Sequence, residues 1–279
     1  MCIPLALDGQ DLIGQAKTGT GKTLGFGVPL LQRIASDSVA GAIPQALVVV
    51  PTRELCVQVA KDLELAGSRQ GTRVLAVYGG RSYEPQVEAL EKGIEVVVGT
   101  PGRLMDLARQ RKLNLSGVKV LVLDEADEML DMGFLPDVEA IVGMLPDVRQ
   151  TLLFSATMPG QIVSLARRYM TSPTHIRASD PNEDNITVDS IEQHVWRAHA
   201  MDKPEIVARV LQANGRGLAI IFCRTKRTAQ KLSDDLADRG FAVGAVHGDL
   251  GQGAREQALR AFRAGKIDVL VATDVAARG

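Results

Sequence analysis

A glycine-rich stretch near the N-terminus has the residue types and spacing that hold phosphate groups. It reads Ala16-Lys17-Thr18-Gly19-Thr20-Gly21-Lys22-Thr23. Glycines let backbone N–H groups curl around phosphate oxygens, and a helix that follows adds the positive end of its dipole. Lys22 would then reach the β- and γ-phosphates of a bound nucleotide, and the Thr23 hydroxyl would ligate Mg²⁺.

The flanking residues favour this phosphate loop over a chance Gly-Lys-Thr turn. The apolar run 11–13 predicts a strand before the loop, and the apolar stretch 24–34 predicts a helix after it. Strand, loop and helix in this order are the context that a phosphate loop requires. Ala16 stands where the usual pattern has its first glycine, and a small side chain is tolerated there.

Two carboxylates stand at the end of a predicted buried strand. The apolar run Val120-Leu121-Val122-Leu123 leads directly into Asp124-Glu125-Ala126-Asp127. In open α/β sheets, ligands bind at the carboxyl ends of the strands. There Asp124 would hold Mg²⁺, directly or through water, and Glu125 would orient and deprotonate the attacking water. Most acidic runs are solvated helix starts, but beside a phosphate loop this run predicts a catalytic role, with Lys22, Asp124 and Glu125 as the residues that would act on a bound nucleotide.

Short β-rich runs alternate with helix-period stretches along the chain. The predicted strands are 46–50, 74–78, 94–99, 119–123, 151–154, 218–223, 242–246 and 269–272. The predicted helices are 54–66, 138–144, 159–169, 203–212, 228–239 and 254–262. Near-continuous apolar strands that alternate with helices are typical of parallel sheets covered on both faces, so the pattern predicts an α/β fold.

The chain of 279 residues is predicted to form two domains. A polar stretch without periodicity, 179–189, is the predicted linker between residues 1–178 and 190–279. The linker holds four acidic residues and no basic residue, whereas residues 190–279 hold 14 basic and 10 acidic residues. The basic balance of the second half is compatible with a polyanionic partner.

Composition limits the class of protein. Hydrophobic residues make up 46% and charged residues 23%, as in folded globular proteins. The apolar runs fall short of the ~18 residues of a membrane-spanning helix, and residues 1–4 show no signal-peptide pattern. Cys2, Cys56 and Cys223 lie far apart without a CxxC pair, which argues against a zinc site or a disulfide framework and favours a cytoplasmic location.

The order of motifs resembles that of a DEAD-box ATP-dependent RNA helicase of bacterial type. After the phosphate loop, the matching motifs are Pro51-Thr52-Arg53-Glu54-Leu55 (Ia), Gly79-Gly80, Thr100-Pro101-Gly102-Arg103 (Ib), Asp124-Glu125-Ala126-Asp127 (II), Ser155-Ala156-Thr157 (III), Ile221-Phe222-Cys223 (IV), His247-Gly248-Asp249 with Gln252 and Arg255, and 272–279 (V). The resemblance covers essentially all of the chain. It implies two RecA-like parallel-sheet domains in tandem, an ATP-binding domain at 1–178 and a helicase C-terminal domain at 190–279, the second incomplete at its C-terminus.

The resemblance also implies which residues bind RNA. They would grip the RNA backbone and are Pro51, Thr52, Arg53, Glu54, Gly79, Gly80, Thr100, Pro101, Gly102, Arg103 and Thr273. Hydroxyl, glycine N–H and guanidinium groups suit phosphate and sugar contacts, which carry no sequence information. For Arg53 a surface ion pair with Glu54 stays open. Aromatic residues make up only 4% of the chain, so base stacking cannot be a main binding device.

Further residues are implied to relay the nucleotide state to RNA binding, or to complete the ATP site. The relay residues are Asp127, Ser155, Ala156, Thr157, Gln252 and Arg255, and the additional ATP-binding residue is Asp274. For Ser155 and Thr157, a hydroxyl N-cap on the helix after Pro159 is nearly as good an interpretation. His247 is either a contact to nucleotide or to motif II, or a packed turn histidine.

Two elements of the family lie outside the sequence. The Q motif, whose glutamine reads adenine, would precede Met1, and motif VI with its arginine fingers would follow Gly279. We therefore expect a fragment truncated at both ends. We expect this chain to bind ATP or ADP weakly through its first domain. Because arginine fingers supply ~10³–10⁵ in rate where they act, we expect negligible hydrolysis.

Three functions are compared at this stage. The motifs favour an RNA-stimulated ATPase that separates short RNA duplexes and remodels ribonucleoproteins. The alternative from a binding class is an ATP-gated RNA clamp that assembles ribonucleoproteins with little unwinding, and strand release during ATP turnover separates the two. A DNA translocase fits less well, because motif II reads DEAD and motif III reads SAT.

Limited proteolysis tests the division into two domains. Because residues 179–189 are polar, acidic and without a predicted strand or helix, their backbone should be cut first. Mass spectrometry should find the earliest fragments ending within this stretch. First cuts inside either predicted α/β half, with the stretch intact, would contradict the division.

Overall fold

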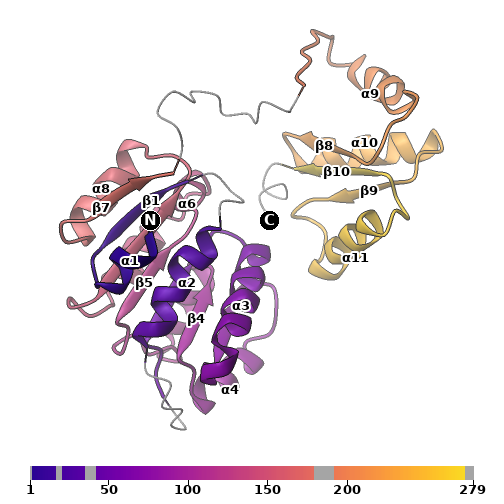
Figure 1. The fold of residues 1–279 in the computed structure, drawn as a ribbon. Coiled ribbons are helices and arrows are strands. Elements are labelled where there is room, and N and C mark those ends of the chain that lie inside the picture. The colour runs from indigo at the N-terminus through magenta and orange to yellow at the C-terminus, as the bar shows by residue number, and fades with distance from the viewer. Residues whose placement is uncertain (1, 17–20, 35–41, 179–191, 274–279) are drawn as a thin grey trace. The chain divides into compact units, whose positions relative to one another are not determined.

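The computed structural model describes residues 2–16, 21–34, 42–178 and 192–273, and most of their helices and strands are labelled in Figure 1. The chain divides into two compact units, Met1–Ile186 (unit 1) and Thr187–Gly279 (unit 2). Each unit is built on one parallel sheet, which confirms the predicted α/β class with two parallel-sheet domains. The predicted linker at 179–189 and the last residues of motif V, 274–279, lie outside the described residues.

Unit 1 contains a seven-stranded sheet in the order β3-β4-β2-β5-β6-β1-β7. The strands are β1 (Leu12–Gln15), β2 (Ala46–Val49), β3 (Val74–Val77), β4 (Val96–Gly99), β5 (Val120–Leu123), β6 (Gln150–Ser155) and β7 (Thr174–Arg177). All neighbouring pairs run parallel. The strands β2, β4 and β5 are buried at every residue, because both faces of the sheet are covered.

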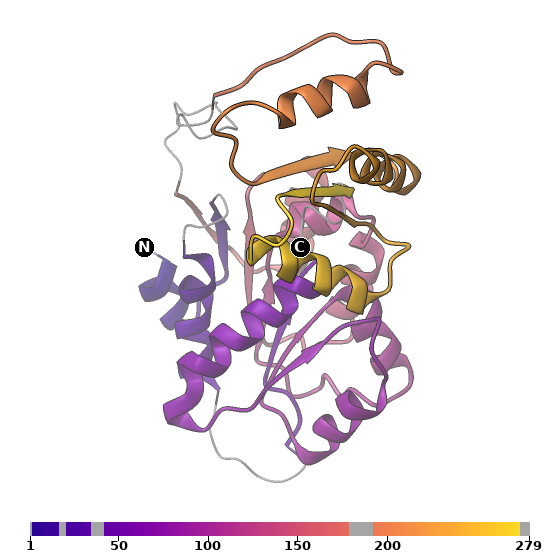
Figure 2. The same ribbon diagram turned by 90° about the vertical axis from the view of Figure 1, so that its right-hand side faces the viewer.

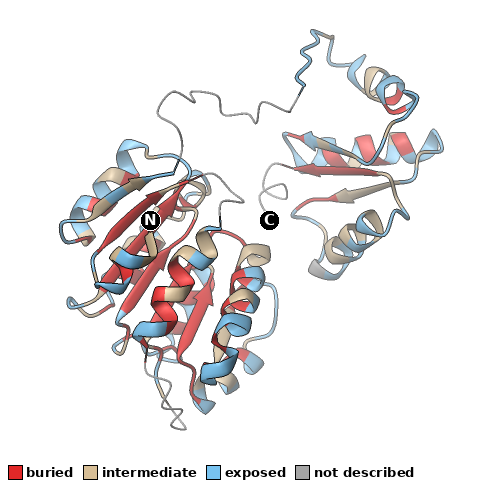
Figure 3. Cartoon of the chain, viewed as in Figure 1, coloured by how far each residue is buried: buried red, intermediate tan, exposed pale blue. Residues whose placement is uncertain are grey.

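Helices pack on both faces of this sheet. They are α1 (Cys2–Leu7), α2 (Lys22–Arg33), α3 (Arg53–Gly67), α4 (Glu84–Lys92), α5 (Pro101–Arg109), α6 (Ala126–Asp131), α7 (Leu135–Val142) and α8 (Gly160–Tyr169), with a short 3₁₀ turn at Ser68–Gln70. Consecutive strand residues belong to different buried clusters: Leu47 packs with α5 to α8, and Val48 packs with α1 to α3. This alternation produces the buried central strands of the sheet, drawn red in Figure 3.

Unit 2 contains a three-stranded parallel sheet in the order β8-β10-β9. The strands are β8 (Ala219–Cys223), β9 (Val243–Val246) and β10 (Val269–Thr273), and the helices are α9 (Lys203–Leu211), α10 (Lys226–Asp238) and α11 (Gln252–Arg263). In both views α9 and α10 lie on one side of the sheet and α11 on the other (Figure 1 and Figure 2). The edge strand β8 is covered on one face only, since Ile220 is 52% and Phe222 is 54% exposed.

All predicted strands and helices are present, with ends shifted by a few residues, but several elements were not predicted. These are β7 and the helices α1, α4, α5 and α6. In Thr174-His175-Ile176-Arg177 every residue except Ile176 is polar, and half-buried and exposed residues alternate along the strand. The sequence therefore has no apolar run that predicts β7. The helices α5 and α6 begin inside Thr100-Pro101-Gly102-Arg103 and Asp124-Glu125-Ala126-Asp127, which the motif analysis assigned to functional sites and not to helices.

Buried polar side chains tie β1 to its surroundings at the end opposite to the phosphate loop. The Asp11 carboxylate is 8% exposed and accepts hydrogen bonds from the backbone N–H groups of Thr151 and Thr171, both at 2.7 Å. The Gln150 amide donates to the carbonyl oxygens of Ala6 (2.8 Å) and Gln10 (2.7 Å). Because buried backbone groups need partners, these bonds hold α1 and the start of β7 in place.

The substitution Asp11→Ala should lower the free energy of unfolding by about 3 kcal/mol, because two backbone N–H groups lose a charged acceptor. Urea unfolding followed by circular dichroism measures the change. Asp8→Ala, at an exposed position three residues earlier in the chain, is the matched control and should shift the free energy of unfolding by less than about 0.5 kcal/mol. Equal unfolding midpoints for the two variants would contradict the role of Asp11.

Candidate active site

Three neighbouring strands bring the phosphate loop, motif II and motif III to one edge of the sheet. β5, β6 and β1 are adjacent, and they lead at their carboxyl ends into Asp124, Ala156 and Ala16. The Ala16 N–H donates to the Ser155 carbonyl oxygen at 3.1 Å, and the Asp124 N–H donates to the Val49 carbonyl oxygen at 3.0 Å. Residues far apart in the sequence are therefore close enough to contact one ligand.

The structure describes the two ends of the phosphate loop, while Lys17, Thr18, Gly19 and Thr20 lie outside the described residues. Ala16 is buried at the end of β1. Gly21 precedes α2 with φ 77, a left-handed conformation that favours glycine. Lys22 and Thr23 form the first turn of α2, where unpaired N–H groups and the helix dipole attract anions. This end of β1 therefore has the backbone features of an anion-binding site.

The first two acids of motif II have raised pKa values. Asp124 is only 3% exposed, and burial raises its pKa, a rise that the positive charge of Lys22 opposes. Burial, followed by the negative charge of Asp124, raises the pKa of Glu125 to about 7. A carboxylate with a pKa near the working pH is suited to accept a proton from water.

Glu125 also has an unusual backbone conformation. Its φ of 53 and ψ of 52 lie in the left-handed region at the turn between β5 and α6. For a residue other than glycine this conformation costs about 1–3 kcal/mol and is found most often at functional sites. The turn separates Asp124, which continues the strand, from Asp127 in the first turn of α6.

Asp127 joins motif II to motif III. Its backbone N–H donates to Ser155 Oγ at 3.1 Å, and its Oδ2 accepts from Thr157 N at 2.9 Å and from Thr157 Oγ1 at 2.8 Å. Burial raises the pKa of Asp127, but hydrogen bonds from Ser155 and Thr157 outweigh burial, and the pKa lies below its ordinary value. Pro159 is the N-cap of α8, and no side-chain hydrogen bond caps this helix. The hydroxyl groups of Ser155 and Thr157 therefore do not cap α8, and the N-cap interpretation is wrong.

The residues predicted to hold Mg²⁺ have the right donor atoms. Thr23 offers a hydroxyl and Asp124 a carboxylate, the hard oxygen donors that Mg²⁺ prefers. Burial raises the pKa of Asp124 and of Glu125, and a cation bound beside them would favour the charged carboxylates. Within the described ranges no group of three or more His, Cys, Asp or Glu side chains is arranged to hold a metal. A nucleotide-bound Mg²⁺ needs only one or two carboxylates besides the phosphates, so the site fits it.

The other half of the same sheet edge carries the residues predicted to bind RNA. Residues 51–54 follow β2, residues 79–80 follow β3 and residues 100–103 follow β4, on the adjacent strands β3-β4-β2. Pro51 and Pro101 are buried, whereas Gly80 and Gly102 are exposed. The sheet therefore separates the two predicted functions along one edge, with β2 next to β5 at the boundary.

Thr52, Arg53 and Gly80 contact their neighbours in ways that shape this surface. Thr52 is the N-cap of α3, and its hydroxyl oxygen accepts from the Leu55 N–H at 3.3 Å. The Arg53 guanidinium lies against Gly80, so a side chain at Gly80 would collide with it. Gly80 also has φ 82, which favours glycine. Thr100 precedes α5, and its hydroxyl makes no capping bond.

Arg103 is buried, at 8% exposure, although its predicted role is to bind RNA. Its guanidinium lies 3.9 Å from the centre of the Tyr83 ring, and Nη2 donates to the Arg81 carbonyl oxygen at 3.0 Å. Its Nη1 is buried without a hydrogen-bond partner among the described residues. In this conformation Arg103 supports the loop that follows β3, and RNA contact by its side chain stays a prediction.

Two residues of this edge were missed by the sequence patterns. The Gln15 amide donates to the Ala156 carbonyl oxygen at 3.3 Å and so links the phosphate loop to motif III. The ring of Tyr83 lies beneath Arg103, and its hydroxyl donates to Asp106 at 3.1 Å. Neither residue belongs to a spaced pattern, and their positions next to Ala16 and shortly after Gly79-Gly80 were the only available signals.

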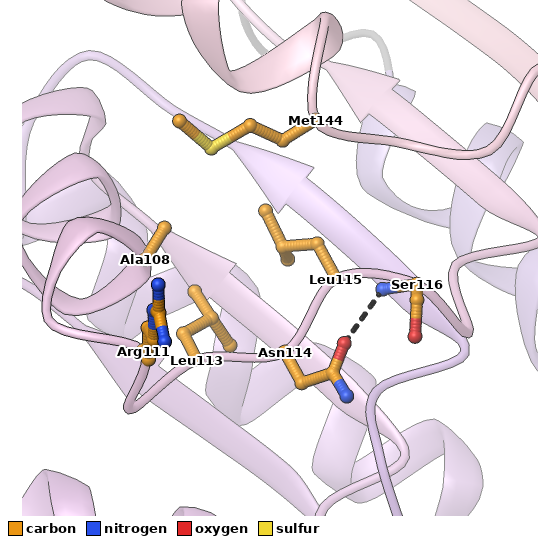
Figure 4. Close-up of a pocket in the computed structure, with 7 residues that line it drawn as sticks. All are labelled: Ala108, Arg111, Leu113, Asn114, Leu115, Ser116 and Met144. Atoms are coloured by element: carbon orange, nitrogen blue, oxygen red, sulfur yellow. Dashed lines mark hydrogen bonds between the residues drawn. The ribbon is translucent and has the colours of Figure 1, made fainter.

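A shallow hollow of about 330 Å³ in unit 1 is not part of this site (Figure 4). It is lined by the end of α5, by the loop 113–116 and by Met144. The Asn114 side chain accepts from the Ser116 N–H at 3.0 Å within this loop. Because the loop leads into the start of β5, the hollow lies at the amino ends of the strands.

In unit 2 the predicted residues stand around the ends of β9 and β10. Thr273 ends β10 and is buried, and Arg255 lies in the first turn of α11. The Gln252 side chain and Asp274 lie outside the described residues. His247 is buried and its Nε2 lies 2.8 Å from Gln230 Oε1, which fits the interpretation as a packed turn histidine.

Comparison with known proteins identifies the family. The sequence profile of the DEAD/DEAH box helicases matches residues 1–165, and that of the helicase conserved C-terminal domain matches residues 202–279. The chain belongs to the DEAD/DEAH box helicase family. The family resemblance noted from the motifs is thereby confirmed.

Curated relatives in this family are close in sequence. The chain is 48% identical to the DEAD-box ATP-dependent RNA helicase CshA of Streptococcus pneumoniae and 49% identical to the ATP-dependent RNA helicase CshA of Listeria monocytogenes. Each alignment extends over 277 residues and covers 99% of this chain and 52% of the relative. The chain thus spans about half the length of the curated relatives it matches.

Solved structures of the family share the fold. Dbp5 of S. cerevisiae bound to RNA and ADP BeF3 matches with a TM-score of 0.83 and 30% identity, covering 97% of this chain and 67% of that chain. A DEAD box protein from the hyperthermophile Methanococcus jannaschii matches with a TM-score of 0.61 and 40% identity, covering 100% and 73%. These likenesses agree with the RecA-like fold that the motifs implied.

The raised pKa of Glu125 makes a testable contribution to stability. Between the ordinary pKa of 4.5 and the folded value of about 7, the unfolded chain loses its proton before the folded chain does. Ionisation therefore destabilises the folded state as the pH rises through this window, and the full cost applies above it. Glu125→Gln removes this cost, so the variant should be more stable than the wild type at pH 8 by about 2 kcal/mol, after allowance for partial exposure.

Urea unfolding at pH 4, 6 and 8 checks this prediction. The difference in the free energy of unfolding between Glu125→Gln and the wild type should vanish below pH 4.5 and grow toward pH 8. Glu88→Gln, at an exposed position on α4, is the matched control and should show no such growth. A difference between Glu125→Gln and wild type that stays constant with pH would mean that burial does not raise the pKa of Glu125.

Proposed function

We propose that the protein is an ATP-dependent RNA helicase, in which RNA-stimulated hydrolysis of ATP drives local separation of short RNA duplexes and ribonucleoprotein remodelling. One observation carries the proposal: the ATP motifs on β5-β6-β1 and the predicted RNA residues on β3-β4-β2 share one edge of a single sheet. Named relatives are ATP-dependent RNA helicases, and a structural neighbour is bound to RNA and ADP BeF3. Both agree with a site for nucleotide beside a site for RNA.

In the proposed ATP site, Lys22 and the N-terminus of α2 hold the phosphates, together with backbone N–H groups of residues 17–20. Thr23 and Asp124 hold Mg²⁺, which neutralises phosphate charge when it is bound. Glu125 accepts a proton from the attacking water, a role supported by its pKa of about 7. Asp274 would complete the nucleotide contacts from unit 2.

The proposed relay begins at Asp127. Because Asp127 is hydrogen-bonded to Ser155 and to Thr157, a movement of motif II on loss of the γ-phosphate would also move motif III. Ala156 belongs to the same segment and accepts a hydrogen bond from Gln15, which precedes the phosphate loop. Gln252 and Arg255 would receive this change in unit 2.

The proposed RNA surface binds the backbone of a single strand without reading its sequence. Arg53 offers a guanidinium beside the exposed Gly80, Thr100 offers a hydroxyl, and exposed Gly102 leaves room for close approach of a phosphate. Arg103 positions the loop after β3 through Tyr83. Thr273 would add a contact from unit 2.

We also propose an ATP-binding domain at 1–178, a linker at 179–189 and a helicase C-terminal domain at 190–279, in a cytoplasmic protein. The free thiols of Cys2, Cys56 and Cys223 suit a reducing compartment. Of the helices in the described part of the chain, none combines the length and apolar character needed to cross a bilayer.

The function is tested by ATP hydrolysis of the whole protein with single-stranded RNA or single-stranded DNA added. RNA should stimulate turnover more strongly than DNA, and a short RNA duplex should release one strand while ATP is consumed.

Glu125→Gln should lower turnover by ~10²-fold or more, because its amide cannot accept a proton, while calorimetry should find Mg-ADP binding retained. Lys22→Ala should lose Mg-ADP binding itself, since a charge-assisted contact contributes at least ~1.5–3 kcal/mol.

Lys61→Ala, at an exposed position on α3, is the matched control for Lys22→Ala and should bind Mg-ADP like the wild type. Turnover without strand release would replace the helicase by an ATP-gated RNA clamp. Equal stimulation by DNA would contradict the preference for RNA. Normal turnover in Glu125→Gln would assign the catalytic base to another residue.

A further inference from the structure

A hollow in unit 2 opens between α9 and α10, over the carboxyl end of β8. Its volume is about 680 Å³, within the range of protein ligand sites. Both helices lie on the same side of the sheet (Figure 1), and the hollow is lined by residues of both. Motif IV, Ile221-Phe222-Cys223, contributes to the lining, whereas the residues of motifs II and III do not.

The hollow has an aliphatic floor. Pro204 and Val207 contribute from α9, Ile221 from β8 and Leu232 from α10. Leu232 is a buried core residue, and Val207 and Ile221 pack against the same core cluster. The floor is therefore a continuation of the apolar core of unit 2 that is open to solvent.

Cationic side chains surround this floor. Lys203 on α9, Arg224 after β8, and Arg227 and Lys231 on α10 all line the hollow and are exposed. None of the four forms an ion pair or a side-chain hydrogen bond within the described part of the chain. Asp235 is the one acid among the lining residues, so the lining carries a net charge of four minus one, or +3.

An apolar floor under a cationic rim selects a ligand that carries both an apolar group and negative charge. Single-stranded RNA supplies negative charge, but its apolar surfaces are planar bases that stack on aromatic rings or guanidinium planes. The lining holds one aromatic ring, Phe222, and the guanidinium groups of Arg224 and Arg227, but the floor itself is made of four aliphatic side chains. An aliphatic or aromatic side chain of a peptide fits this floor, and neighbouring carboxylates pair with the rim.

The spacing of the cations also suits a peptide. Arg227 and Lys231 are one turn apart on α10, which places them about 6 Å apart along the helix axis. Alternate residues of an extended peptide are about 6.6 Å apart, so two acids in an Asp/Glu-x-Asp/Glu arrangement match this pair. Lys203 stands on the facing helix α9 and can pair with an acid on the other flank.

We propose that the hollow between α9 and α10 binds an acidic peptide segment of a partner protein, anchored by one aliphatic or aromatic side chain on the floor. The binding requires neither ATP nor RNA, because none of the residues proposed to contact ATP or RNA lines the hollow. Charge complementarity to the four cations determines the partner's chemistry, and the floor supplies the anchor point.

Selection from a phage-displayed library of random dodecapeptides on the 279-residue chain, without ATP, tests the proposal. Selected peptides should carry two or more Asp or Glu residues beside Leu, Ile, Val or Phe. In fluorescence anisotropy, the double variant Lys203→Glu/Lys231→Glu should bind them at least tenfold more weakly, a change of about 1.4 kcal/mol. Arg263→Glu/Lys266→Glu, at exposed positions at the end of α11 and just beyond it, is the matched control and should bind like the wild type.

Two further measurements keep the outcome decisive. Circular dichroism should show that both double variants fold like the wild type, and Val207→Lys, which places a charge in the floor, should also weaken binding of the peptides. No enrichment of acidic peptides, or equal affinity for Lys203→Glu/Lys231→Glu and wild type, would overturn the proposal. A labelled oligouridine whose binding is weakened by Lys203→Glu/Lys231→Glu, while peptide binding is unchanged, would identify a nucleic-acid surface instead.

Discussion

The parallel pairing of β5, β6 and β1 is the constraint on which the candidate site depends. Parallel strands end at the same edge of a sheet, so three segments that are far apart in the sequence meet there. The backbone bond from Ala16 to Ser155 fixes the relative height of the phosphate loop and motif III. Only with this register can Asp127 accept two hydrogen bonds from Thr157.

The acidic residues that follow β5 lower the stability of the folded chain, and the same features suit them to proton transfer. Burial of Asp124 and Glu125 raises both pKa values, and the left-handed backbone of Glu125 adds strain. Such costs are tolerated because the surrounding sheet is buried on both faces and holds the turn in place. A bound phosphate with its cation would remove much of the electrostatic cost, and nucleotide binding should therefore stabilise this unit.

The two units use their sheets differently. In unit 1 the central strands are covered on both faces, and the polar chemistry is confined to their carboxyl ends. In unit 2 the edge strand β8 leaves Ile220 and Phe222 more than half exposed, and Ile221, Phe222 and Cys223 of this strand also line the hollow beside α9 and α10. A small sheet with so much accessible apolar surface is well suited to contacts with other chains.

The sequence by itself determined the fold class, most elements and the set of motifs at the sheet edge. Apolar strand runs and helical periods are local properties, and each motif is a contiguous run such as Asp124-Glu125-Ala126-Asp127, so both can be read without long-range information. Only the tertiary structure decided that Thr157 bonds to Asp127 instead of capping α8, and that Arg103 packs on Tyr83. These choices depend on partners that are 20 or 30 residues away along the chain, for which the local sequence carries no signal. The polar strand β7 forms for the same reason, because the paired edge of β1 supplies the hydrogen bonds that its own sequence does not announce.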